Sequence, residues 1–283
     1  MTKIAEQQEM CFRLGGRSRI PSYKRLCTFF LRHLAITDLG YSTAVGPKML
    51  ANFVVDKNTI SYYFCAIQLA FFLVFIVSEI FILSAMSYDH YVAICHPLLY
   101  TVIMSQRVCW VLLSIPYLCS TIVSLLVTIK IFKLSFCHDN VIRYYYCDCL
   151  PLLSLLCSKT HEIELIILIL PAFDLISSLL IVLVSYLLIL VAILRMKSAE
   201  GRHKAFSTCG SHLTVVVVFD GTLIFMYVQP KSSHSSDTDK VASIFYTLLI
   251  PLLNPLIYSL RNKVVINALY RTLKKICNTF STV

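Results

Sequence analysis

Long apolar runs separated by short polar connections dominate the chain. A bilayer core of about 30 Å requires roughly 20 mostly apolar residues per helix. Four runs have this length and few charged side chains, at residues 60–89, 108–129, 165–194 and 241–260. Two more runs, 26–55 and 205–230, have the same length but contain several ionisable side chains. The pattern therefore predicts an all-α membrane protein with about six spans.

The overall composition supports the same fold class. Of 283 residues, 58% are hydrophobic and 14% are charged, whereas soluble domains contain about 45–50% and about 25%. The net charge of +10 does not indicate nucleic-acid binding, because the basic residues lie between apolar runs and not along one stripe. Residues 1–21 lack an apolar segment followed by a cleavage site, so we expect the first hydrophobic helix to act as the insertion signal.

The distribution of basic residues predicts the topology. Short cytoplasmic loops carry an excess of lysine and arginine. Most of the 25 such residues lie before the first run, after the second, between the fourth and fifth, and after the sixth. Both termini are therefore predicted to be cytoplasmic. Residues 1–25 form a short basic cytoplasmic segment, 26–262 the helical bundle, and 263–283 a cytoplasmic tail with a short amphipathic helix.

Four motifs appear in a fixed order on this hydropathy map. They are PKML at 47–50, MSYDHYVAICHPL at 86–98, SAEGRHKAFSTC at 198–209 and PLLNPLIYSLRN at 251–262. The second is similar to MAYDRYVAICHPL, the signature of olfactory receptors in the rhodopsin-like class A of G-protein-coupled receptors. The other three resemble motifs of the same family, and the resemblance extends from about Phe29 to the carboxyl end.

This resemblance implies a fold and a function. The fold is a rhodopsin-like helical bundle in which the six spans correspond to family helices two to seven. The implied function is binding of a small volatile hydrophobic odorant at the plasma membrane and signalling through a heterotrimeric stimulatory G protein to adenylyl cyclase. No cofactor is implied. An enzyme is not indicated, because the sequence shows no nucleophile–base set and no phosphate-binding loop.

Three features depart from the family pattern. The family's glycosylated extracellular tail and first helix have no counterpart before Phe29. His90 replaces the arginine of the family's Asp-Arg-Tyr triplet, and Asp220 stands where the family usually has the tyrosine of Phe-Tyr-Gly. These departures favour an alternative, a non-signalling truncated receptor-like protein retained in the ER or partnering with full-length receptors. A transporter or channel is a further alternative, but the inverted repeats typical of that class are not evident.

The resemblance also implies which residues switch and couple to the G protein. These are Asp89, His90, Tyr91, Asp220, Asn254, Pro255 and Tyr258. Proline removes a backbone donor and kinks a helix, so Pro255 suits a hinge. Histidine is shorter than arginine and mostly neutral at cytosolic pH, so His90 predicts weaker coupling.

Ionisable residues within the apolar runs are candidates for a polar core. Such groups cost roughly 2.5–3.5 kcal/mol on insertion scales and tend to face the bundle interior. Asp38 and Glu79 lie near mid-depth of neighbouring runs and match a polar, sodium-linked core in the family. Alternatively, each carboxyl is protonated or bonded to a neighbouring hydroxyl or backbone group. Asp174 is equally well explained as a neutral acid or as a ligand contact.

Apolar and aromatic residues on two runs are candidates for the ligand site. Such linings suit small hydrophobic molecules, and ordinary helix packing or lipid contact is the alternative. The candidates are Phe72, Leu73 and Ile76 on the second run and Leu223, Ile224 and Tyr227 on the fifth.

The long connection at 130–164 contains four of the twelve cysteines. The family resemblance implies disulfides between Cys65 and Cys147 and between Cys137 and Cys157, with Cys149 free. Zinc binding by these loop cysteines and His138 is an alternative. The loop is expected on the oxidising side of the membrane, which favours disulfides, and it lacks the paired CxxC spacing typical of zinc sites.

Overall fold

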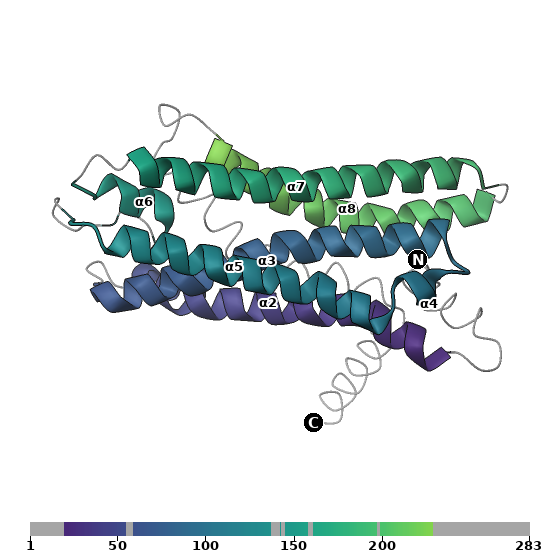
Figure 1. Ribbon diagram of the computed structural model, residues 1–283, viewed down its shortest axis with the longest axis horizontal. Helices are drawn as coiled ribbons and strands as arrows, with labels where there is room; N and C mark the ends of the chain where they lie inside the picture. The colour runs from purple at the N-terminus through teal and green to yellow at the C-terminus, as the bar shows by residue number, and fades with distance from the viewer. Residues whose placement is uncertain are drawn as a thin grey trace, which may run out of the picture.

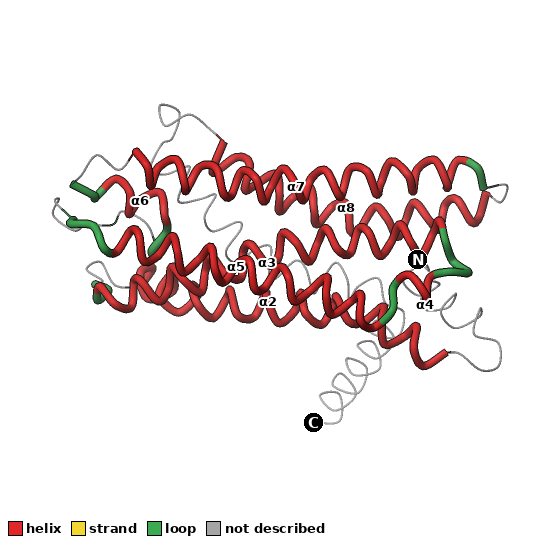
Figure 2. Tube along the Cα trace, viewed as in Figure 1, coloured by secondary structure: helices red, strands yellow, loops and turns green. Residues whose placement is uncertain are grey.

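The computed structural model describes residues 20–54, 59–136, 142, 145–157, 161–196 and 199–228. Five long helices run side by side in this part of the chain (Figure 1), with the described loops at the ends of the bundle (Figure 2). The long helices are α2 (Ile20–Val54), α3 (Tyr62–Cys95), α5 (Gln106–Phe132), α7 (His161–Leu194) and α8 (Ala199–Val228). Two short helices, α4 (Tyr100–Ile103) and α6 (Cys149–Ser154), lie in the connections. The expected all-α bundle is confirmed.

Helix α3 is the centre of the described bundle. It packs against α2, α5, α7 and α8, and Figure 1 shows it between these neighbours. Most of its side chains are buried from Ile76 to Ala93. A helix surrounded on several sides has little surface left for lipid, so α3 is suited to connect the two ends of the molecule.

Local sequence signals explain where the helices begin and end. Helix α2 starts at Ile20 with Pro21 in its first turn, a position where the missing N–H of proline is tolerated. The Ser61 hydroxyl caps α3 by accepting a hydrogen bond from Phe64 N. Helix α3 ends at Cys95, because Pro97 disfavours the helical conformation for the residue before it.

Three helices in the described residues are long and apolar enough to cross a membrane. These are Tyr62–Cys95, Gln106–Phe132 and Ile169–Leu194. Helices α2 and α8 lie beside them (Figure 1) but are more polar, so their assignment as spans stays a prediction. The sixth run, 241–260, most of the basic segment 1–25 and the tail 263–283 lie outside the described residues.

Small polar side chains connect the helices. Ser78 Oγ on α3 lies 2.8 Å from Ser120 Oγ on α5, and Ser124 Oγ donates to Ala70 O at 2.6 Å. On the other side of α3, Ser178 Oγ of α7 donates to Ile80 O at 3.2 Å. Interhelical hydrogen bonds of this kind contribute about 0.6 kcal/mol each in membranes. They fix the rotation of α5 and α7 relative to α3.

Helix α2 approaches α3 closely at Gly40. A Cβ atom at this position would overlap the ring of Phe75. The absence of a side chain therefore allows the aromatic ring to lie directly against the α2 backbone.

Candidate functional site

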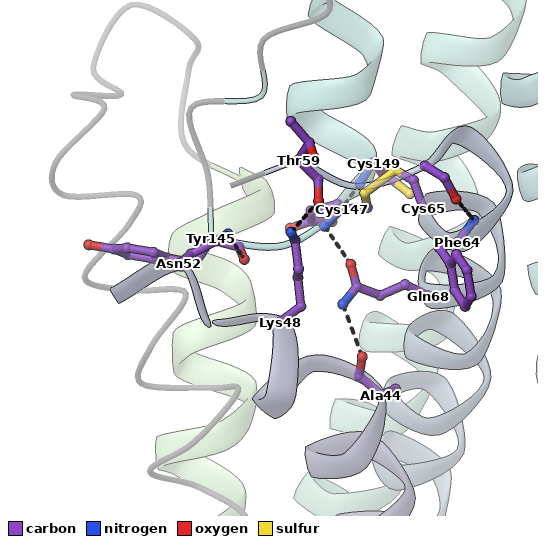
Figure 3. The surroundings of a disulfide bond; sticks show 12 residues. Ala44, Lys48, Asn52, Thr59, Phe64, Cys65, Gln68, Tyr145, Cys147 and Cys149 are labelled. Carbon is purple, nitrogen blue, oxygen red and sulfur yellow. Dashed lines mark hydrogen bonds between the residues drawn. A yellow bond between two sulfur atoms is a disulfide. The ribbon is translucent and has the colours of Figure 1, made fainter. Parts of the chain in front are cut away.

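The connection between α5 and α7 is covalently joined to α3. Cys147 forms a disulfide with Cys65 in the first turns of α3, as the family resemblance implied. Figure 3 shows Gln68 directly beside this disulfide. Its side-chain oxygen accepts a hydrogen bond from Cys147 N at 3.0 Å, and its Nε2 donates to Ala44 O on α2 at 3.0 Å. Gln68 thus joins α2, α3 and the loop.

Two further contacts hold the loop and the α2–α3 connection at this end. Asn52 Nδ2 donates to Tyr145 O at 2.6 Å, and Lys48 Nζ donates to Thr59 O at 2.8 Å. Both contacts come from the last two turns of α2, as Figure 3 shows. The loop therefore forms a fixed cover over the extracellular ends of α2 and α3.

The remaining loop cysteines differ in state. Cys157 is disulfide-bonded, whereas its expected partner Cys137 lies outside the described residues, so that pair stays a prediction. Phe136 and Leu156, which precede the two cysteines in sequence, pair as an antiparallel bridge. Cys149 is free and buried, as expected, and burial raises the pKa of its thiol well above the usual value.

These observations disfavour the zinc alternative. Cys147 and Cys157 are disulfide-bonded and cannot supply thiolate ligands. Within the described residues, no group of three His, Cys, Asp or Glu side chains is placed to hold a metal ion. His138 and Cys137 lie outside those residues.

Several candidate ligand residues lie beneath this cover. Phe72, Ile76 and Leu223 are buried in one hydrophobic cluster, and Leu73 packs against it. The ring of Phe72 stacks on Tyr41 of α2, with centroids 5.5 Å apart, and also contacts Tyr146 of the loop at 5.5 Å. Tyr41 and Tyr146 were not predicted to lie here, because their proximity to Phe72 depends on how α2 and the loop pack.

Another candidate ligand residue, Ile224, is not part of this cluster. Ile224 is 38% exposed and lies on the outer side of α8, where contact with lipid is the simpler explanation. The side chain of Tyr227 lies outside the described residues. Their roles as ligand contacts stay predictions.

Asp38 and Glu79 are both buried, at 5% and 0% exposure. Helices α2 and α3 thus each bury one acidic side chain. This arrangement agrees with the polar core that we expect here, and its role stays a prediction.

At the cytoplasmic end, the Asp89-His90-Tyr91 triplet makes contacts that differ for each residue. Asp89 is buried and its Oδ1 accepts a hydrogen bond of 2.6 Å from the hydroxyl of Tyr100 on α4. Tyr91 Oη lies 3.2 Å from His96 Nε2. Asp89 thus anchors the short helix α4 to α3.

His90 points across to α8. Its Nδ1 lies 2.6 Å from Met86 O, so this nitrogen carries the proton and donates. Its ring stacks on His212 with centroids 5.1 Å apart. His212 Nδ1 in turn lies 2.8 Å from the hydroxyl of Tyr186 on α7. We call these three side chains, His90, His212 and Tyr186, the cytoplasmic cluster.

Sequence reasoning missed the cytoplasmic cluster as a unit. His212 and Tyr186 lie within apolar runs, and polar residues in such runs tend to face the bundle. That signal was available, but it does not specify partners. Asp220, another switch candidate, is buried on α8 at 3% exposure, whereas Asn254, Pro255 and Tyr258 lie outside the described residues.

Known proteins match this chain over nearly its whole length. A family model described as olfactory receptor matches residues 21–276. Human olfactory receptor 8K3 is 77% identical over 268 residues, covering 95% of this chain and 84% of that receptor. The chain belongs to the olfactory receptor family. Human olfactory receptor 8K1 is 69% identical, with 92% of this chain and 80% of that receptor covered. Mouse olfactory receptor 8U3 is 56% identical, with 93% and 81% covered.

Membership of this family indicates the class of the protein and its general activity. As an olfactory receptor, the protein is an odorant-binding G-protein-coupled receptor of the membrane and not an enzyme. The disulfide-anchored loop and the cytoplasmic cluster lie at opposite ends of α3. Helix α3 contributes residues to both.

Proposed function

We propose that this olfactory receptor acts at the plasma membrane, binds small volatile hydrophobic molecules between α3 and α8, and signals through a stimulatory G protein to adenylyl cyclase. The observation that supports the ligand site is the buried apolar cluster of Phe72, Ile76 and Leu223 beneath the disulfide-anchored loop. Apolar linings with few polar groups suit ligands of this class. Such a ligand contacts α3 and α8 together and can change how they pack.

The cytoplasmic cluster supports a route from ligand to G protein. His90 on α3 stacks on His212 on α8, and His212 contacts Tyr186 on α7. The stack joins α3 to α8 without the permanent charge of an arginine, because His90 takes the place of the family's arginine. We propose that ligand binding separates this stack and exposes the cytoplasmic ends of the helices to the G protein.

A second candidate function is a receptor-like protein that inserts but does not couple. His90 favours it, because a neutral imidazole lacks the planar, permanently charged fork of arginine. Retention in the ER or association with full-length receptors would then account for its role. Asp220 supports the same candidate only through its position in the proposed switch region.

Cyclic AMP in transfected cells, normalised to surface receptor, distinguishes the two candidates. With a panel of aliphatic odorants, the first predicts a rise in cyclic AMP that disappears in cells lacking the stimulatory α subunit. His90→Arg should increase that response severalfold. His203→Arg is the matched control, because His203 is exposed on α8 and lies outside the cluster. No response from either the native chain or His90→Arg would contradict the signalling proposal and favour the second candidate.

A further inference from the structure

Helix α8 contains a buried acidic residue that lacks a compensating partner on one oxygen within the described residues. Asp220 is 3% exposed, and its Oδ1 has no hydrogen-bond partner in the described part of the chain. Ionised carboxyl groups are costly in an apolar interior unless a cation or hydrogen-bond donors compensate them. The observed packing leaves one strong acceptor atom of Asp220 available.

The buried side chains next to Asp220 along α8 are apolar. Phe219 and Leu223, one residue before it and three residues after it, are buried at 1% and 3% exposure. Both belong to the hydrophobic cluster that contains Phe72 and Ile76 of α3. The carboxyl group of Asp220 therefore adds an acidic group to the largely apolar side of α8 that joins this cluster.

The depth of Asp220 agrees with a ligand contact. It lies eight residues beyond His212, which corresponds to about 12 Å along α8 at 1.5 Å per residue. His212 marks the cytoplasmic cluster through its stack on His90. Asp220 thus lies well inside the bundle, towards the covered extracellular end and away from the cytoplasm.

We infer that Asp220 binds the polar end of a small apolar ligand, and that this polar end is a protonated amine. The inference rests on the proposed odorant site and specifies its chemistry. An ionised carboxylate is an acceptor only, so it selects a ligand that donates. An ammonium group supplies donors together with the compensating charge. The tyrosine usual at this position in the family carries no such charge. Asp220 should therefore give this receptor a preference for amines that the usual tyrosine would not give.

The test uses purified full-length receptor in lipid nanodiscs, without G protein, and n-hexylamine as the probe. A ligand that binds only the folded state raises the thermal unfolding midpoint. Hexylamine should raise the midpoint of the native chain more than 1-hexanol at equal concentration, since 1-hexanol has the same chain length but no charge. Asp220→Asn should weaken the apparent hexylamine affinity by about 10- to 100-fold, the range expected for a charge-assisted hydrogen bond.

Asp174→Asn is the matched control, because Asp174 is a partly buried acid on α7 and its loss should leave the hexylamine shift intact. Asp220→Tyr restores the residue usual in the family and provides a second variant, also expected to lose the shift. Three results would overturn the inference: no shift with the native chain, equal shifts in the native chain and Asp220→Asn, or loss of the shift only in Asp174→Asn. Because no G protein is present, a failure to couple leaves this result intact. Odorant-driven cyclic AMP without an amine preference would leave the proposed function in place and remove this inference alone.

Discussion

Replacing Gln68 should measurably destabilise the protein, because this one buried side chain forms hydrogen bonds with both the loop and α2. Gln68→Met keeps the length of the side chain and removes both hydrogen bonds. Cys147 is 1% exposed, so its N–H would be left buried without its partner, at a cost of about 1–3 kcal/mol. The lost bond to Ala44 O adds about 0.5–1.5 kcal/mol. The total loss of unfolding free energy is therefore roughly 1.5–4.5 kcal/mol.

Thermal unfolding of the purified receptor in nanodiscs, followed by circular dichroism, measures this loss. For a chain of this size, each kcal/mol lowers the midpoint by about 2–4 °C, so the unfolding midpoint of Gln68→Met should be roughly 3–18 °C lower. Ile67→Met is the control, because Ile67 is 53% exposed on the outer face of the same helix turn. It should stay within about 0.5 kcal/mol of the native chain. If the two variants unfold together, the reasoning about Gln68 is wrong.

The disulfide should change how much unfolding free energy is lost when Gln68 is replaced. In a Cys65→Ser background the loop is no longer tethered, so Cys147 N–H can turn towards water when its partner is removed. Gln68→Met should then cost less than it does in the native chain. The difference between the two costs is the coupling energy, and contacting residues typically give about 0.5–3 kcal/mol. Simple additivity would indicate that Gln68 and the disulfide hold the loop independently.

Three further predictions concern single polar groups. Tyr41 Oη is buried without a hydrogen-bond partner in the described chain, so Tyr41→Phe should raise stability by about 1 kcal/mol, measured as a higher unfolding midpoint. The same substitution at Tyr100 removes a bond to the buried Asp89 and should lower stability by about 1.5–3 kcal/mol. Midpoint shifts of the same sign in the two variants would contradict one of these two predictions. Burial raises the pKa of the Cys149 thiol, so the folded state favours the neutral thiol. The free energy of unfolding should therefore fall as the pH rises above about 8.5, because the thiol then ionises in the unfolded chain first. Peptide mapping after alkylation at pH 8.5 should find Cys149 modified slowly in the folded receptor and rapidly in detergent-unfolded chain.

Much of the fold follows from the sequence alone. Apolar runs of sufficient length predicted the positions of the five long helices now described, because bilayer thickness sets helix length. Pro97 determines where α3 ends, since it restricts the residue before it. The family motifs implied the Cys65–Cys147 disulfide, and the structure contains it.

Only the tertiary structure decided which side chains meet. The stack of His90 on His212 and the bond from Tyr100 to Asp89 join residues on different helices. Neither partner could be named from spacing along the chain, and the short helices α4 and α6 were not predicted at all. These contacts depend on the rotation of each helix about its own axis.

That rotation is weakly encoded in a membrane protein for a physical reason. A soluble helix shows its buried face as an apolar stripe opposite a polar one, but lipid is as apolar as the bundle interior. Leu223 and Ile224 are neighbours with similar side chains, yet one is 3% exposed and the other 38%. Hydropathy therefore determined which residues enter the bilayer, and packing of small, polar and aromatic groups between helices determined which of them face one another.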